Sequence, residues 1–314
     1  MLALSIIPRW LAVAVTPIIL GVAKSDVLHA FASDDGIPRT HVAVTAYFDL
    51  LGFTEEMRAA QRFGKSNEFL QRVAATLKSW YEAARDTSSD LWGNDRRLWE
   101  LKAFTDNVVI GHPIRHGGEP ELGHLMSDLA MLQLAFILEG DLFLRGGIAA
   151  GELYMDDDIV YGTALLDAVA TEHNADAPRV LMHPSAVRLV REQLRHYASI
   201  RNAPHTRIVL RDEDGRFFIN YLSAALEYAS GSLEEWLEKH REVVVRRLER
   251  HRKSPRVWSK YAWVARYHNY FCGSLVGIKD LTIDVTLLSL GAARLDQVFR
   301  NTRAGSRKSK KAKS

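Results

Sequence analysis

Short β-branched and aromatic runs alternate with helical periodicity between residues 41 and 223, and this alternation constrains the fold more than any other feature of the chain. Residues 41–48 (HVAVTAYF) predict a strand, and residues 212–215 (DEDG) predict a hairpin turn. Strands and helices mixed along one stretch indicate an α/β or α+β domain. We predict strands at 41–48, 98–104, 108–114, 142–150, 159–161, 179–182, 207–211 and 217–222, helices at 54–84 (with Thr54 as N-cap), 122–140 and 164–174, and a polar loop at 86–95.

A helical pattern replaces this alternation after residue 223. Ser232 and Glu235 form a capping-box signature, and aromatic residues recur at helical spacing between residues 257 and 272. Such a density of aromatic side chains is typical of a core or a subunit interface. We therefore divide the chain into an N-terminal extension (1–40), an α+β domain (41–223), a helical region (224–300) and a disordered basic tail (301–314).

The two ends of the chain bear on its partners and location. The tail carries six basic residues and no acidic one, and the rest of the chain has 35 basic and 38 acidic residues. The charge therefore excludes a strongly basic nucleic-acid-binding domain, and weak attraction of the tail to nucleic acid or a membrane surface is the alternative to a solvated end. The apolar run at 11–22 is interrupted by Pro17 and is shorter than the ~20 residues that span a bilayer, so we expect no stable membrane anchor; a cleaved signal peptide is the alternative. The single cysteine, Cys272, excludes a disulfide framework, and we expect a cytoplasmic protein.

Most standard catalytic motifs are absent from the sequence. It contains no P-loop, no GxGxxG, no HExxH and no GxSxG, and the spacing of its histidines matches no zinc pattern. Two aspartates remain as candidates for chemistry. Asp49 ends the first predicted strand at a glycine turn that leads into a helix, and Asp106 lies at the reversal between the next two strands.

Two carboxylates on adjacent strand ends would hold one or two Mg²⁺ or Mn²⁺ ions, which prefer oxygen ligands. The turn that follows Asp49 offers backbone N–H groups at a helix N-terminus, where a polyphosphate binds readily. Together these features predict a two-metal phosphoryl-transfer site. Taken alone, either aspartate is better explained as a helix cap or a turn residue, so the prediction depends on both occurring together with the glycines that follow.

Four segments, in chain order, resemble motifs of the class III nucleotide cyclases. They are 46–54 (AYFDLLGFT), 102–106 (KAFTD), 144–151 (LRGGIAAG) and 161–164 (YGTA), and their order and spacing fit across about residues 41–223, nearly two thirds of the chain. The resemblance implies a ferredoxin-like βαββαβ core, and hence an α+β fold with a helical C-terminal extension. It also implies a head-to-tail homodimer with its active sites at the subunit interface.

The resemblance further implies roles for individual residues. Asp49 and Asp106 would bind two divalent cations, Mn²⁺ or Mg²⁺, with the Leu50 carbonyl as a further ligand. One ion would lower the pKa of the ribose 3′-hydroxyl, and the other would neutralise the departing pyrophosphate. The β- and γ-phosphates would lie on the turn formed by Leu51, Gly52, Phe53 and Thr54.

The sequence departs from the family pattern at three positions. Ile159 replaces the aspartate that, with the lysine matched by Lys102, recognises adenine. Loss of this acceptor costs adenine recognition about 1–3 kcal/mol. Leu166 and Ala170 replace the asparagine and arginine that orient the ribose and stabilise the transition state. Arg179 or Arg145 is the candidate replacement for the missing positive charge.

This combination most resembles the pyrimidine cyclases of bacterial Pycsar anti-phage systems, whose cyclic UMP or cyclic CMP activates a separate effector. Strand alternation places Tyr47 on the same face as Asp49, where it would fill the space of a purine or be a plain core residue. Lys102 would donate to O4 of uracil. We therefore predict a uridylate cyclase, a phosphorus–oxygen lyase. The alternatives are a cytidylate cyclase, an adenylate or guanylate cyclase, or a degenerate nucleotide-binding signalling module.

Overall fold

The computed structural model describes residues 29–33, 35–92, 98–115, 117–228, 232–275 and 277–284, with side chains 83–92, 228 and 279 excepted. Most of the predicted N-terminal extension and the whole predicted basic tail lie outside the described residues, as do residues 285–300 of the predicted helical region.

A mixed sheet forms the centre of the fold, in the strand order β2-β3-β1-β4-β6-β8-β7, with β5 paired to β4. All neighbouring strands are antiparallel except β4 and β6. The first four strands follow the chain order β-α-β-β-α-β and lie in the order 2-3-1-4, which is the ferredoxin-like arrangement. This confirms the predicted α+β fold. The strands are β1 (His41–Leu51), β2 (Glu100–Phe104), β3 (Asn107–Pro113), β4 (Phe143–Met155), β5 (Val160–Tyr161), β6 (Val180–Met182), β7 (Val209–Arg211) and β8 (Phe217–Ile219).

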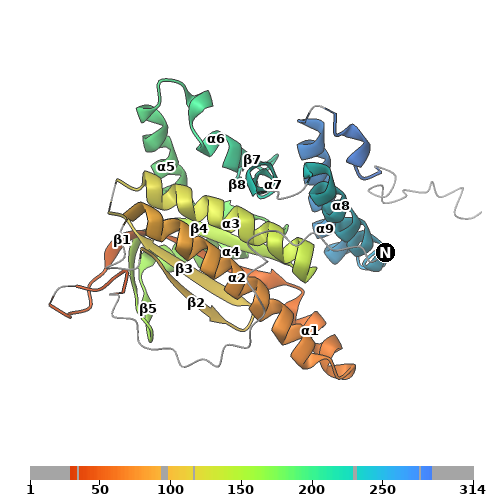
Figure 1. Cartoon of the computed structure of the whole chain (residues 1–314), viewed down its shortest axis with the longest axis horizontal. Coiled ribbons are helices and arrows are strands. Elements are labelled where there is room, and N and C mark those ends of the chain that lie inside the picture. The colour runs from red at the N-terminus through yellow and green to blue at the C-terminus, as the bar shows by residue number, and fades with distance from the viewer. Residues whose placement is uncertain are drawn as a thin grey trace, which may run out of the picture.

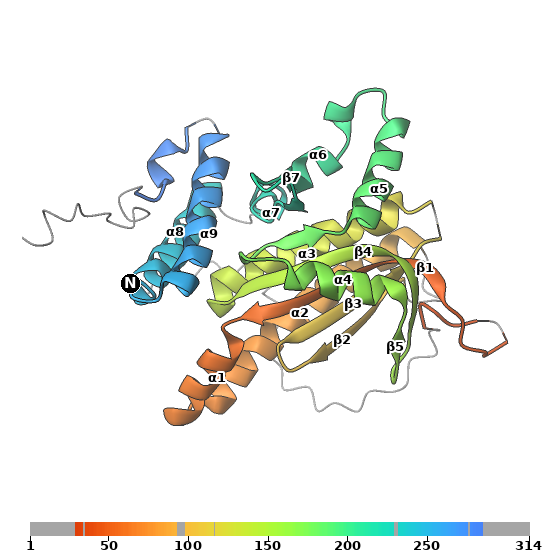
Figure 2. The same ribbon diagram turned by 180° about the vertical axis from the view of Figure 1, so that it is seen from behind.

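Helices cover the two faces of this sheet unequally (Figures 1 and 2). The helices α2 (Ser66–Trp92) and α3 (Glu119–Gly140) pack together on one face, and α4 (Thr163–His173) lies on the other. Among the described residues, α3 is the one helix long and apolar enough to cross a membrane, but 67% of its apolar window is buried inside the fold. It therefore serves here as the core helix.

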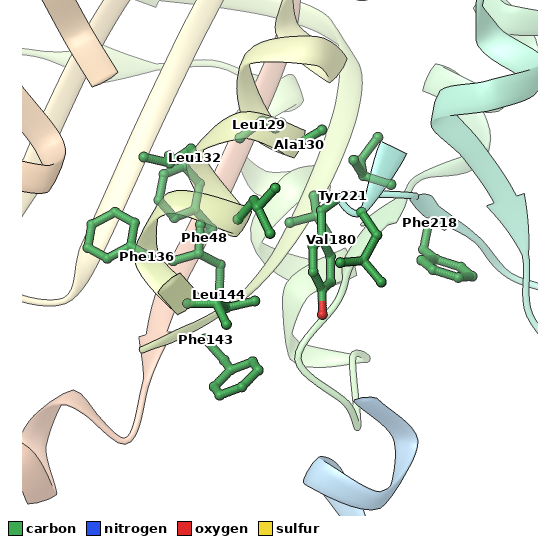
Figure 3. Close-up of a cluster of buried hydrophobic side chains, with 14 of the residues drawn as sticks. Phe48, Leu129, Ala130, Leu132, Phe136, Phe143, Leu144, Val180, Phe218 and Tyr221 are labelled. Carbon is green, nitrogen blue, oxygen red and sulfur yellow. The ribbon is translucent and has the colours of Figure 1, made fainter. Parts of the chain in front are cut away.

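The main core lies between α3 and the sheet (Figure 3). Phe48 from β1, Leu144 from β4, and Leu132 and Phe136 from α3 are all almost fully buried. The alternation of β1 produces this arrangement, because the side chains next to Phe48 in sequence point to the opposite face. Burial of each such side chain contributes about 1.5–3 kcal/mol to folding.

The predicted first helix is wrong in its start, its continuity and its end. The helix begins at Phe53 as α1 (Phe53–Arg62), with Gly52 and not Thr54 as its N-cap residue. It then breaks before α2, because Gly64 adopts a left-handed conformation (φ 70°) that a continuous helix excludes. At the other end, α2 continues to Trp92 through most of the stretch predicted as a polar loop.

The C-terminal part of the described chain is helical, as predicted. The helices α8 (Leu233–Arg250) and α9 (Pro255–Gly273) pack against each other, and the Ser232 hydroxyl accepts a hydrogen bond from the Glu235 amide (3.2 Å) as the capping signature requires. Most aromatic side chains of α9 are buried, but Tyr270 is exposed. The remaining helices are α5 (Pro184–Gln193), α6 (His205–Ile208), α7 (Ser223–Tyr228) and the 3₁₀ turns Leu194–His196, Ile200–Asn202 and Lys279–Leu281. Because α6 occupies residues 205–208, the strand predicted from 207 begins at 209.

A buried chain of hydrogen bonds joins this helical pair to the sheet domain. The Tyr221 hydroxyl lies 2.9 Å from His240 Nε2, His240 Nδ1 lies 3.0 Å from His268 Nδ1, and His268 Nε2 lies 2.9 Å from the Leu281 carbonyl. One arrangement of protons satisfies all three contacts, with both imidazoles neutral and each group donating to the next. Burial lowers the pKa of both histidines, so the neutral forms are favoured.

Candidate active site

Asp49 and Asp106 meet at one end of the sheet. In the pairing of β1 with β3, Asp49 lies opposite Asn107, the residue that follows Asp106. The Leu50 amide donates a hydrogen bond to the Asp106 carbonyl (2.9 Å), which ties the end of β1 to the β2–β3 turn. The two aspartates predicted from the sequence therefore occupy adjoining strand ends.

The β2–β3 turn holds Asp106 through its own side chains. Thr105 has a positive φ of 56°, an uncommon conformation for a residue with a side chain. Its hydroxyl lies 2.8 Å from Asp106 Oδ1, and the Asn107 amide nitrogen donates to the same oxygen at 3.0 Å. These hydrogen bonds fix one oxygen of the Asp106 carboxylate within the turn.

Tyr47 lies at the point where the acidic groups converge. Its hydroxyl donates a hydrogen bond to the Asn107 side-chain carbonyl. Burial raises the pKa of Tyr47, and the negative charges of Glu172, Asp49 and Asp106 raise it further. Three carboxylates, from β1, the β2–β3 turn and α4, thus act on one phenol and make this part of the sheet electronegative.

Arg145 occupies this acidic cluster and links two of its members. It lies opposite Asp49 in the pairing of β1 with β4 and donates to both carboxylate oxygens, at 3.2 and 3.1 Å. The same guanidinium lies 2.5 Å from the Glu172 carboxylate. Close packing of α4 makes this possible, because a Cβ at Gly147 would lie 2.2 Å from the Ala168 carbonyl. The structure therefore brings Arg145 into the site.

Arg179, the other candidate cation, is directed elsewhere. Its guanidinium pairs with Asp212 and Asp214 of the β7–β8 hairpin and lies over the Trp263 ring, 5.4 Å from the ring centroid. The side chain is almost fully buried. Because both of its ion pairs lie in the hairpin, the structure does not bring Arg179 together with Asp49.

Lys102 shares a face of the sheet with Tyr47. It lies opposite Val109 of β3, which in turn lies opposite Tyr47 of β1, so that the three residues form one row across the sheet. The Lys102 ammonium donates a hydrogen bond to the Asp157 carbonyl. Lys102 is thus placed two strands away from Tyr47, with its charge held by the loop after β4.

The turn at residues 51–54 presents an uncapped helix N-terminus. Gly52 has φ 80° and provides no side-chain cap to α1. The first helical hydrogen bond joins the Glu56 amide to the Gly52 carbonyl (3.0 Å), so the three preceding amides have no partner within the helix. The Phe53 ring packs beside Phe69 of α2 (5.2 Å between centroids), while Gly52 and Thr54 on either side of it are exposed. Such a helix end attracts phosphate oxygens.

The donor atoms at this site fit a divalent cation shared with a phosphate ligand. Asp49 and Asp106 offer carboxylate oxygens, and Leu50 offers a backbone carbonyl between them in the chain. Within the part of the chain that the structure describes, no group of three or more His, Cys, Asp or Glu residues is arranged to hold a metal ion. Mg²⁺ commonly binds through one or two carboxylates and completes its shell with water and phosphate oxygens, which this donor set allows.

Sequence reasoning missed the part that Glu172 plays. Ala164, Ala168 and Glu172 follow at intervals of four along α4, and all three are buried. A carboxylate in a buried stripe of a helix requires a partner of opposite charge. That spacing was the available indication that Glu172 faces the sheet and pairs with a basic residue there.

Comparisons with known proteins return similarity only at the level of solved structures. No family model matches the chain, and no curated protein matches it. The guanylyl cyclase domain of the RhoGC fusion protein from the aquatic fungus Blastocladiella emersonii is 11% identical with a TM-score of 0.41, over 58% of this chain and 96% of that one. The guanylate cyclase domain of RhGC from Catenaria anguillulae, in complex with GTP, is 12% identical with a TM-score of 0.37, over 58% and 97%.

A third similar structure is a class III adenylyl cyclase-like ATP-binding protein from Pseudomonas aeruginosa, 11% identical with a TM-score of 0.33, over 48% of this chain and 35% of that one. The chain is thus similar in fold to nucleotide cyclase domains. Likenesses at these identities and TM-scores carry no argument about function, which we base on the residues of the site.

Proposed function

We propose that the chain is a metal-dependent nucleotide cyclase that converts a nucleoside triphosphate, UTP in preference to CTP, to its 3′,5′-cyclic nucleotide and pyrophosphate. The observation that carries this proposal is that Asp49 and Asp106 lie at adjoining strand ends, beside the uncapped N-terminus of α1. Carboxylates for cations and free amides for phosphates are the two elements that a phosphoryl-transfer site needs.

The proposed reaction forms one bond and breaks one bond. The ribose 3′-oxygen bonds to the α-phosphorus, the bond from this phosphorus to the bridging oxygen breaks, and its electron pair leaves with pyrophosphate; the hydroxyl proton passes to solvent. Divalent cations, when bound, lower the pKa of the 3′-hydroxyl and neutralise the leaving group. In this scheme Asp49 and Asp106 hold the cations, and the amides of the 51–54 turn bind the β- and γ-phosphates.

Base selection is assigned to Tyr47 and Lys102. The Tyr47 ring is held through its hydroxyl on Asn107, and Lys102 lies in the same row of the same face. A fixed aromatic ring there would leave room for a pyrimidine rather than a purine. Lys102 would exchange its bond to the Asp157 carbonyl for O4 of uracil.

We assign the active unit to a homodimer that pairs the faces carrying α4. Large apolar side chains are exposed on β5 and just before it, on α4 and at the end of β2, as expected of a surface that another molecule covers. These side chains are Ile159, Tyr161, Leu166 and Phe104, which are 53%, 67%, 69% and 54% exposed. The proposal extends to a role of the cyclic product in anti-phage defence, through a separate effector.

An assay of the full chain with each of the four nucleoside triphosphates tests the proposal. With Mn²⁺, we expect cyclic UMP as the main product, identified by chromatography and mass spectrometry. Asp49→Asn and Asp106→Asn should each reduce turnover at least about 100-fold, whereas Asp35→Asn, at an exposed ion pair with Arg39, should leave it unchanged. Cyclic AMP as the main product would contradict the base assignment, and full turnover in either site variant would contradict the metal assignment.

A nucleotide-binding module without turnover is the second candidate. The ion pair between Arg145 and Asp49 favours it, because this contact competes with a metal ion for the Asp49 carboxylate. Binding of a triphosphate with no cyclic product from any of the four nucleotides, under Mg²⁺ and under Mn²⁺, would decide for this candidate.

A further inference from the structure

The helices α8 and α9 are fixed to the end of the sheet that carries the site. The Tyr261 ring of α9 meets the Phe143 ring edge-on, 5.3 Å between centroids, and Phe143 lies opposite Leu51 in the pairing of β1 with β4. On α8, Arg247 donates to Glu56 in the first turn of α1 (2.6 Å) and pairs with Asp141 just before β4 (3.3 Å). The helical pair thus contacts α1, which follows the 51–54 turn, and β4, which pairs with β1 just before it.

Lys260, the residue before Tyr261, brings a positive charge to the same place. Its side chain is partly buried. Burial lowers the pKa of Lys260 and the nearby Arg145 lowers it further, whereas the Asp49 carboxylate raises it. Phe143 and Arg145 lie two residues apart on β4 and so share a face of the sheet, and the contact of Tyr261 with Phe143 therefore places this part of α9 beside the Asp49–Arg145 pair.

Lys260 differs from the other cations near the site because its charge is not engaged. Arg145, Arg179 and Lys102 each form an ion pair or a hydrogen bond. Among the described residues, the Lys260 ammonium has no hydrogen-bond or ion-pair partner. A partly buried ammonium without an ionic partner is free to bind an anion that enters the site.

We propose that Lys260 binds the polyphosphate of the nucleotide at the Asp49 site and supplies the positive charge that α4 lacks. This inference rests on the proposed function, since it takes the ligand to be a nucleoside triphosphate. The α4 positions 166 and 170 carry only apolar side chains, so neither contributes charge. Arg256, one turn earlier on α9, is exposed and adds to the positive potential around Lys260. The helical pair is then part of the substrate site.

Substitution of Lys260 in the full chain tests this inference. Binding of a fluorescent UTP analogue and of the matching monophosphate is measured with Mg²⁺ for the wild type, Lys260→Gln and Lys260→Arg. Lys253→Gln is the matched control, because Lys253 is exposed in the turn between α8 and α9. We expect Lys260→Gln to weaken triphosphate binding about tenfold, equivalent to about 1.4 kcal/mol, with a smaller effect on the monophosphate, and Lys260→Arg to retain most of the affinity.

The outcomes separate this inference from the proposed function. If the wild type binds no triphosphate, both are wrong. If the wild type binds and cyclises the nucleotide while Lys260→Gln behaves like Lys253→Gln, only the inference is wrong. A loss of affinity that is equal for the two nucleotides, or that Lys260→Arg does not restore, would show a packing role and would also overturn it. Thermal unfolding of each variant confirms that the fold is retained.

Discussion

Glu172→Gln tests whether the ion pair of Arg145 controls access of a metal ion to Asp49. The guanidinium is shared between Glu172, at 2.5 Å, and Asp49, at 3.1 Å. Hydrogen bonds to charged groups contribute about 1.5–3 kcal/mol each. Without the Glu172 charge, the guanidinium binds Asp49 alone and competes more strongly with a cation. If the contact between Arg145 and Asp49 becomes stronger by about 1.4 kcal/mol when the Glu172 charge is removed, metal binding at Asp49 weakens about tenfold.

A titration with Mn²⁺ measures this effect, with cyclase rate or triphosphate binding as the signal. We expect the apparent Mn²⁺ affinity of Glu172→Gln to fall about tenfold and that of Arg145→Gln to rise. Burial and the neighbouring Asp49 raise the pKa of Glu172. Acidification should therefore neutralise Glu172 first and lower the Mn²⁺ affinity of the wild type towards that of Glu172→Gln. An unchanged Mn²⁺ affinity in Glu172→Gln would refute the reasoning. A loss that persists in the double variant with Arg145→Gln would instead make Glu172 a metal ligand.

Two further predictions concern stability. Burial lowers the pKa values of His240 and His268 in the folded chain. Below about pH 6.5 the unfolded chain therefore binds more protons than the folded chain, and the free energy of unfolding should fall by about 1.4 kcal/mol per pH unit for each histidine. Denaturant unfolding between pH 7.5 and 5.5 measures this, and a slope that His240→Gln does not reduce would contradict it. Gly147→Ala should destabilise by about 1–3 kcal/mol, because the new Cβ would lie 2.2 Å from the Ala168 carbonyl. Gly123→Ala in α3 has open space and should stabilise by about 0.5–1 kcal/mol in thermal unfolding, so equal Tm shifts in the two variants would count against the packing of α4.

Local patterns predict much of this fold because they act over a few residues. The alternation of β1 separates Phe48, which faces the core, from Tyr47 and Asp49 on the opposite face, and the structure has the same separation. The boundaries that failed depend on backbone conformation. Gly52 starts α1 and Gly64 ends the helical stretch through positive φ angles, which side-chain periodicity does not reveal.

The partners of charged residues could not be predicted in the same way. Arg179 was a candidate cation from its position in the chain, but the hairpin that follows β6 supplies Asp212 and Asp214 as its partners. Glu172 pairs with Arg145 because α4 crosses the sheet at Gly147. Both pairings depend on contacts between segments far apart in sequence, so only the three-dimensional arrangement determines them.

The balance of charge at the site is the reason why α9 would matter to the cyclase that we propose. Asp49, Asp106 and Glu172 outweigh the single guanidinium of Arg145, so a triphosphate would be repelled from the cluster until cations neutralise it. Two divalent cations remove this repulsion, but they leave the charge that develops on the departing pyrophosphate to be met by protein groups. The free amides at the start of α1 would stabilise part of this pyrophosphate charge from one side of the site. In our proposal Lys260 supplies a cation on the other side, where Arg247 anchors α8 to α1. That anchor would make the α8–α9 pair part of the nucleotide site.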